Sequence, residues 1–223
     1  HRDVGRDALR LQQLGDVLGP PGERPLGDQP LELVLVGFAS RERREAGVGS
    51  QGVAADELGS RLDAAVAPLG VGPRTIRVRT FHALGREILR DAGTDVSGLV
   101  DRTTVLATLF PHLATAELAR LDTVISRLKL DLGVSAEEVA ADPEAGPNAR
   151  AFVTYERDLA ARGAIDFDDL VRGALRALDA DPELLARWRA RCAHLLVDEV
   201  QDVDRSQLRL ALARLALGDV ETA

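Results

Sequence analysis

The sequence predicts an α/β fold, in which a partial parallel sheet is interrupted by a helical subdomain inserted before the sheet's last strand. Strand-like apolar runs occur at residues 31–38, 75–81 and 193–199. The run at 195–197 is continuously apolar, which is typical of a strand covered on both faces. Residues 100–192, in contrast, carry helical patterns alone. A helical block between two pieces of one sheet indicates a domain inserted into another.

The first elements follow one another as strand-to-helix units. Residues 1–30 are interpreted as an irregular leader that ends in a loop rich in Gly and Pro. The strand at 31–38 precedes a stretch rich in Arg and Gly, and then a helix at 53–69. The strand at 75–81 continues into a helix that Gly93 ends. Two such units therefore precede the helical block.

Helix start signals mark the rest of the chain. Ser135 and Glu138 have the spacing of a capping box, and Asp181 precedes a proline at the first helical position. Asp204 has the place of an N-cap for the final helix. We therefore expect the helical subdomain to cover residues 96–192, and the chain to return to the sheet domain after it.

Composition limits the classes of protein. The 223 residues are 45% hydrophobic but only 3% aromatic, so the core is expected to consist of Leu, Val and Ala. The single cysteine excludes an internal disulfide, and the net charge of −8 argues against binding nucleic acid through bulk positive charge alone. Among the 28 basic residues Lys129 is the one lysine. With no apolar run long enough for a membrane span and no signal peptide, no membrane contact and a cytoplasmic location are expected.

Acidic residues stand at the end of the last predicted strand. Asp198 and Glu199 directly follow three large apolar residues, and a half-buried carboxylate needs a metal or a partner to offset its desolvation. Ligands of parallel sheets bind outside the carboxyl ends of the strands. In phosphoryl-transfer sites an acid at this place holds Mg²⁺. The acids at 166–169, "DFDD", are instead interpreted as helix caps rather than metal ligands.

Several segments resemble one family. The segment "LLVDEVQDVDRSQ" at 195–207 resembles the Walker B segment of UvrD/Rep-type superfamily 1 DNA helicases, whose pattern is DE-x-QD followed by a Gln. "VRTFHALGREILR" at 78–90 is similar to the family's TFH segment, and "ISRLKLDLGVSAEEVA" at 125–140 to its helical insertion. "AIDFDDLVRGAL" at 164–175 is similar to the stretch before Walker B, and "VLVGFAS" at 34–40 to the motif before TFH.

The resemblance implies a partial RecA-like P-loop NTPase domain, formed by residues 31–95 and 193–223. It further implies that Asp198 binds the Mg²⁺ of MgATP through its water shell and that Glu199 orients the hydrolytic water. Gln201 would contact the nucleotide or couple it to DNA, and Asp202 would support the site.

The resemblance also implies contacts with single-stranded DNA. Thr80, Phe81 and His82 form the TFH match, and Phe38 would be a stacking residue of the earlier motif. Stacking suits a motor that ignores base sequence, because every base has a π-face. Without the family, Phe81 would be a core residue and His82 a polar helix start.

The chain departs from the family pattern in two places. It contains no G-x-x-x-x-G-K-[ST], the pattern that cradles phosphates, and "AGVGSQGV" at 46–53 is interpreted as a loop. The later helicase motifs are also missing, and the chain begins at His1 without any methionine. We therefore expect a fragment of an ATP-dependent DNA helicase that is inactive without the rest of the helicase chain and its second RecA-like domain. Two alternatives stay open, namely a non-catalytic DNA-binding or protein-interaction module and a different Mg²⁺-dependent phosphotransferase.

Overall fold

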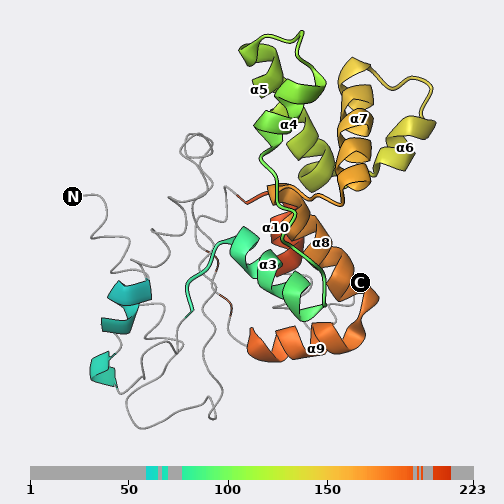
Figure 1. The fold of residues 1–223 in the computed structure, drawn as a ribbon. Helices are drawn as coiled ribbons and strands as arrows, with labels where there is room; N and C mark the ends of the chain where they lie inside the picture. The colour runs from blue at the N-terminus through green and yellow to red at the C-terminus, as the bar shows by residue number, and fades with distance from the viewer. Residues whose placement is uncertain are drawn as a thin grey trace. The chain divides into compact units, whose positions relative to one another are not determined.

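The computed structural model describes residues 59–64, 67–69, 77–192, 195, 197 and 203–211 (Figure 1). The chain divides into two compact units, one formed by His1–Thr80 with Ala190–Glu199 and the other by Phe81–Arg189 with Val200–Ala223.

In the first unit, residues 59–64 are helical and lie within the helix that the sequence predicts at 53–69. The 3-10 helix η2, Ala67–Leu69, follows them. Leu62 is buried in this unit, with 3% of its surface exposed. Residues 77–80 have no regular secondary structure.

The prediction of a parallel sheet is wrong for the described residues. This part of the chain is mostly helical and contains no strand. A β-ladder requires a second extended segment beside the first, and none is described beside residues 77–80. Phe81, predicted as the last residue of a strand, instead starts a helix, because its apolar neighbours recur at helical spacing. The predicted strand at 31–38 lies outside the described residues. One isolated parallel bridge joins Leu99 to Ile165.

Helices make up most of the chain from Phe81 onward. They are α3 (Phe81–Asp91), α4 (Arg102–Leu109), α5 (Thr115–Ser126), the π-helix η3 (Arg127–Leu132), α6 (Ala136–Ala141), α7 (Pro147–Arg162), α8 (Phe167–Ala180), α9 (Pro182–Arg191) and α10 (Arg205–Leu208). No helix among the described residues is both long enough and apolar enough to cross a membrane.

The predicted helix boundaries are confirmed where the signal was a cap. Ser135 Oγ accepts the Glu138 backbone N–H at 3.1 Å, and the Glu138 carboxylate accepts the Ser135 N–H, which completes the capping box of α6. Asp181 caps α9 by accepting the backbone N–H of Leu184 at 3.0 Å. Gly93 follows α3 with a φ of +76°, a conformation that favours glycine.

Helices α4, α5 and α7 pack around one hydrophobic core and lie together in Figure 1, with α6 against α7. The members of this core are buried aliphatic and aromatic side chains: Val105, Leu106, Leu121, Ile125, Phe152, Tyr155 and Leu159. Tyr155 and Phe152 are fully buried, although the chain as a whole is poor in aromatics. Large rings therefore supply much of this core's volume.

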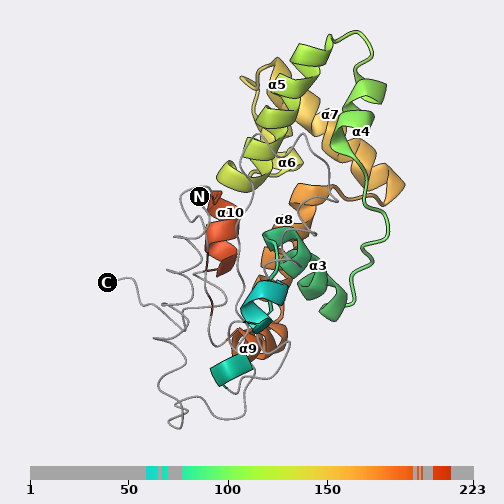
Figure 2. The same ribbon diagram turned by 90° about the vertical axis from the view of Figure 1, so that its left-hand side faces the viewer.

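Helices α3 and α8 lie side by side in both Figure 1 and Figure 2. Their contact is closest at Gly85, where an added Cβ would overlap the carbonyl oxygen of Leu170 and lie 2.8 Å from its carbonyl carbon. A mid-helix glycine costs about 1 kcal/mol relative to alanine. Here it lets the two backbones approach each other, and Leu89, Val96 and Leu170 form a buried cluster at the same contact.

Candidate functional site

All four residues predicted to serve the nucleotide lie outside the part of the chain that the structure describes. They are Asp198, Glu199, Gln201 and Asp202. The predicted stacking residue Phe38 also lies outside the described residues. Asp204 is described, and its Oδ1 accepts the Gln207 backbone N–H at 2.8 Å at the start of α10. The prediction that Asp204 is an N-cap is therefore confirmed.

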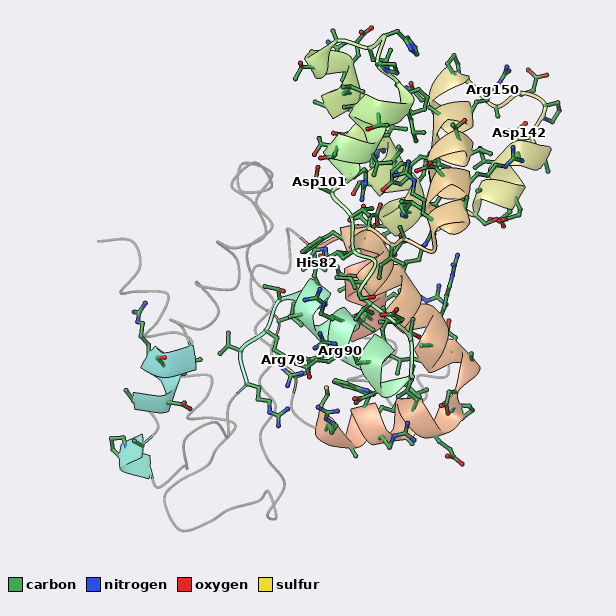
Figure 3. All side chains as sticks on the ribbon, viewed as in Figure 1. Arg79, His82, Arg90, Asp101, Asp142 and Arg150 are labelled. Atoms are coloured by element: carbon green, nitrogen blue, oxygen red, sulfur yellow. The ribbon has the colours of Figure 1, made fainter. Side chains whose placement is uncertain are left out.

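The predicted DNA-binding triplet straddles the start of α3. Thr80 is half-buried at the end of the first unit, whereas Phe81 is 3% exposed and belongs to the core of the second. His82 is half-buried in the first turn of α3 (Figure 3). Its ring centroid lies 4.9 Å from that of Phe167, with the ring planes tilted by 52°. His82 is therefore the ring of this triplet that keeps access to solvent.

Phe167 is the first residue of α8, within the "DFDD" segment. Asp166 is the N-cap, and its Oδ1 accepts the Asp169 backbone N–H at 3.0 Å. Asp169 in turn accepts the Asp166 N–H through Oδ2 at 3.1 Å. The prediction that these acids cap a helix is confirmed, and no group of acids, histidines or cysteines among the described residues is suited to hold a metal ion.

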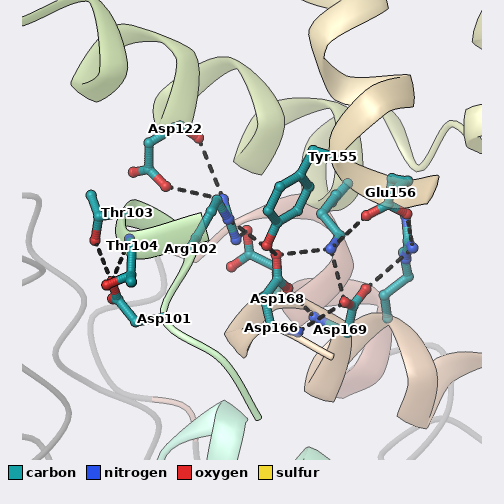
Figure 4. Close-up of polar contacts among 12 residues, drawn as sticks. Asp101, Arg102, Thr103, Thr104, Asp122, Tyr155, Glu156, Asp166, Asp168 and Asp169 are labelled. Atoms are coloured by element: carbon teal, nitrogen blue, oxygen red, sulfur yellow. Dashed lines mark hydrogen bonds and ion pairs between the residues drawn. The ribbon is translucent and has the colours of Figure 1, made fainter. Parts of the chain in front are cut away.

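A group of mostly buried, mainly ionic side chains from several helices meets at the start of α8, and we call it the Lys129 cluster (Figure 4). Its members are Arg102, Asp122, Lys129, Tyr155, Glu156, Asp166, Asp168, Asp169 and Arg172. Lys129 lies at its centre with 0% of its side chain exposed. Its Nζ is 2.9 Å from a carboxylate oxygen of each of Glu156, Asp166 and Asp169.

Asp166 links the cap to the cluster through its second carboxylate oxygen. Oδ2 accepts hydrogen bonds from Arg102 Nε at 3.1 Å, Lys129 Nζ at 2.9 Å and Tyr155 Oη at 2.8 Å. Because these donors come from α4, η3 and α7, one side chain at the start of α8 contacts three other helices. A buried carboxylate is tolerated when it is paired and hydrogen-bonded in this way.

Two arginines complete the cluster. Arg172 Nη2 lies 2.6 Å from Glu156 Oε2 and 3.2 Å from Asp169 Oδ1. Arg102 contacts Asp168, and its Nη1 lies 3.4 Å from Asp122 Oδ1. The three cations thus face five carboxylates, of which Asp122 is 36% exposed and the other four are at most 14% exposed.

The pKa values of these groups follow from burial and from their partners. Burial opposes the charge of Asp166, but Arg102 and Lys129 outweigh it and hold the pKa of that carboxyl below its ordinary value. Burial also opposes the charged form of Lys129, yet the facing carboxylates, Asp166 first, raise the pKa of its ammonium group. Asp169 differs, because burial and then the charge of Asp166 raise its pKa. At neutral pH Lys129 is therefore held charged.

Sequence reasoning missed Lys129 as a structural centre. The only sign of this role in the sequence was that all the remaining basic residues, counted as Lys and Arg, are arginines. A GC-rich coding bias also explains that pattern. A compact ammonium group with three donors faces three carboxylates here from 2.9 Å each, at the end of a side chain with no exposure to water.

Comparison with known proteins identifies the class of this chain. The UvrD/REP helicase N-terminal domain matches residues 51–219, which include the DE-x-QD segment, α3 and every residue of the Lys129 cluster. The chain therefore belongs to the UvrD/REP helicase family.

Individual relatives are ATP-dependent DNA helicases. The chain is 31% identical over 149 residues to UvrD1 of Mycobacterium leprae, covering 58% of this chain and 19% of the relative. It is 30% identical over 152 residues to Rep of Escherichia coli, covering 61% and 22%. It is 31% identical over 155 residues to PcrA of Leuconostoc citreum, covering 60% and 20%. The chain thus spans about a fifth of the length of these curated relatives.

Proposed function

We propose that this chain is a nucleotide- and DNA-contacting part of an ATP-dependent DNA helicase, which moves along single-stranded DNA and unwinds duplex by hydrolysing MgATP. The observation that carries the proposal is the acidic segment DE-x-QD at 198–202 inside the family match at 51–219. In this proposal residues 31–95 and 193–223 carry the nucleotide and DNA contacts, residues 96–192 form a helical subdomain, and the remainder of the helicase chain is the partner.

Within the proposal the acids divide the chemistry between them. Asp198 would hold Mg²⁺ through the ion's water shell, because Mg²⁺ keeps several waters and needs only one or two carboxylates, and the ion would neutralise phosphate charge. Glu199 would orient the attacking water and accept its proton, with Gln201 and Asp202 supporting the nucleotide. Asp204 is assigned to the cap of α10, where its Oδ1 accepts the Gln207 N–H, and the proposal gives it no role in this chemistry.

The DNA contact is proposed for Thr80 and His82, with Phe38 as a further stacking residue. Phe81, the first residue of α3, supports them from the core, because it is only 3% exposed. The ring of His82 packs against that of Phe167 at 4.9 Å, and a base or sugar would stack on its other face. A contact of this kind does not read the base sequence.

Substitution of Glu199 tests the proposal in a full-length helicase that carries this segment. Glu199→Gln should reduce DNA-stimulated phosphate release by at least about a hundredfold, because the amide cannot accept the proton. Binding of MgATP, measured by calorimetry, should stay close to that of the unaltered protein. Asp198→Ala should instead weaken the Mg²⁺-dependent part of nucleotide binding.

The matched control is Asp204→Asn, which removes a carboxylate from the same segment but keeps a good N-cap. It should leave phosphate release unchanged. If Glu199→Gln and Asp204→Asn had the same small effect, the catalytic role of the acids at 198–199 would be wrong. If the full-length protein released no phosphate with single-stranded DNA, the helicase function itself would be wrong.

A further inference from the structure

Helices α3 and α8 run parallel and in register, so that their first turns lie beside each other. Three pairs of neighbouring residues define this register, and the partners are 85, 85 and 84 positions apart in the sequence: His82 with Phe167, Gly85 with Leu170, and Leu89 with Gly173. The backbone approach at Gly85 leaves no space for one more carbon atom, so it opposes sliding of one helix along the other. His82 is therefore held opposite Phe167.

The position of Phe167 is also fixed by the cap of α8. Asp166 directly precedes it and exchanges hydrogen bonds with Asp169 at 3.0 and 3.1 Å. The second carboxylate oxygen of Asp166 accepts three hydrogen bonds from donors of the Lys129 cluster. A capped first turn satisfies backbone N–H groups that have no partner inside the helix. An apolar contact and an ionic one, both within the second unit, thus determine where the Phe167 ring lies.

The contact between the two rings restricts the side chain of His82. The ring centroids are 4.9 Å apart and the planes are tilted by 52°, which is the geometry of a favourable aromatic pair. Ordering a side chain during binding lowers affinity, and a side chain that is already ordered avoids this cost. The Phe167 ring should therefore increase the affinity of His82 for a ligand that contacts it.

We propose that Phe167 is a positioning residue for the DNA contact of His82, and that the cap at Asp166 sets the place of its ring. The inference rests on the proposed function, in which His82 contacts single-stranded DNA, and adds the residue that orients the histidine. Phe167 acts through His82 and contacts no DNA itself. Because stacking on a ring does not read the base sequence, the effect of Phe167 is the same for different strands.

The test measures DNA affinity in a full-length helicase that carries this segment. Fluorescence anisotropy at fixed salt gives the dissociation constants for a labelled oligothymidine and for a labelled oligonucleotide of mixed sequence. Phe167→Leu keeps an apolar side chain and removes the ring. It should weaken the binding of both strands by about 2- to 10-fold, the range that corresponds to the loss of one aromatic pair.

Two further variants separate positioning from a general loss of structure. In a protein that already carries His82→Ala, Phe167→Leu should cause no further loss of affinity, because the ring that it orients is absent. A purely structural role would weaken binding in both backgrounds. Phe167→Tyr keeps an aromatic ring and should bind DNA within about twofold of the unaltered protein.

Another pair of Phe and His in the same unit supplies a matched control. The ring centroids of Phe110 and His112 lie 6.4 Å apart, with the planes at 78°, and His112 is exposed. The proposed function gives neither residue a contact with DNA. Phe110→Leu makes the same substitution in the same kind of pair and should leave DNA affinity unchanged.

A loss in Phe167→Leu that disappears in the His82→Ala background, with Phe167→Tyr and Phe110→Leu normal, supports the positioning role. If His82→Ala weakens binding but Phe167→Leu does not, the positioning role is wrong and the proposed DNA contact stands. Equal losses in the two backgrounds, or an equal loss in Phe167→Tyr or Phe110→Leu, would also overturn it. If His82→Ala leaves DNA affinity unchanged, the proposed contact of His82 fails, and the role of Phe167 with it.

Discussion

Helix α8 is held at two places by two kinds of interaction. Its middle packs against α3 through apolar side chains and the close approach at Gly85. Its first turn is held by the Lys129 cluster, in which buried cations and carboxylates contact α4, α5, η3 and α7. The two places lie on one helix, so differences in their response to substitution reflect the interaction and not the element.

The comparison shows what each region depends on. The apolar contact between α3 and α8 depends on volume. Where the two backbones touch at Gly85, there is no space for one more carbon atom. The ionic region depends on charge balance, since removing one member leaves its partners buried without compensation. The same helix is therefore sensitive to an added methyl group at one place and to a lost charge at the other.

The largest effect is expected from Lys129→Met, which keeps an unbranched side chain of similar size and removes its charge. Asp166, Asp169 and Glu156 would then lose their shared cation, at a cost of about 3–5 kcal/mol in the free energy of unfolding. Thermal and urea unfolding of the 223-residue chain measure this loss. An unfolding midpoint equal to that of the unaltered chain would show that the cluster does not stabilise the fold.

Gly85→Ala is expected to have the second largest effect. The new Cβ meets the backbone of Leu170, so the helices must separate, at a cost of about 1–3 kcal/mol. Gly173→Ala on α8 is the matched control, because its Cβ would meet only the side chain of Leu89 at 3.2 Å. A flexible side chain can move and the helix propensity improves, so the control should be neutral or stabilising. Equal losses in the two variants would contradict the close backbone approach at Gly85.

The ionic region should also make stability depend on pH. The pKa of Asp166 and that of Glu156 are lowered, since their cations outweigh the cost of burial. Their contribution is present above the unfolded values of about 4 and is lost as the pH falls through the folded values. Asp169 acts in the opposite direction, because burial and Asp166 raise its pKa, and it offsets part of the gain above pH 4.

Asp166→Asn tests this pH dependence, because asparagine keeps the N-cap and cannot ionise. The free energy of unfolding, measured in urea from pH 2 to pH 7, should fall less steeply toward low pH in the variant. The expected difference is on the order of 1–3 kcal/mol, because the stability that ionised Asp166 contributes is lost on acidification only in the unaltered protein. Parallel curves for the two proteins would show that Asp166 does not carry the acid sensitivity.

The smallest effect is expected outside both regions, at Ser135. Ser135→Ala removes the cap of the short helix α6, which has no buried residue, and should cost about 0.5–1 kcal/mol. Ser135→Gly should cost only about a few tenths of a kcal/mol in the free energy of unfolding. A loss as large as that of Lys129→Met would contradict the view that the ionic region dominates the stability of this unit.

The sequence predicted those features of the fold that depend on local signals. The capping box at Ser135, the cap at Asp181 and the end of α3 at Gly93 were predicted correctly, because neighbouring residues determine them. The predicted parallel sheet was wrong for the described residues. Strand formation at 77–81 requires a partner from elsewhere in the chain, whereas the apolar residues from Phe81 onward already satisfy a helix.

The candidate site was less predictable than the helices. Asp166 and Asp169 were identified as caps, but their contacts with Lys129 join residues 37 and 40 positions apart. Such contacts depend on the packing of helices and leave no periodic signal. The predicted partner of His82 was DNA, and its packing against Phe167 was not foreseen, since the two residues are 85 positions apart. The roles of residues 198–202 stay predictions.

The central claim is that Lys129 stabilises this unit by balancing the carboxylates around it. The most direct measurement compares urea unfolding of Lys129→Met with that of Lys129→Met/Asp166→Asn, which removes one charge of each sign. The claim predicts that the double variant is more stable than Lys129→Met by about 1–2 kcal/mol, because one uncompensated carboxylate is gone. If Lys129→Met has no cooperative transition, the double variant should regain one. A double variant that is as unstable as the sum of its single substitutions would contradict the claim.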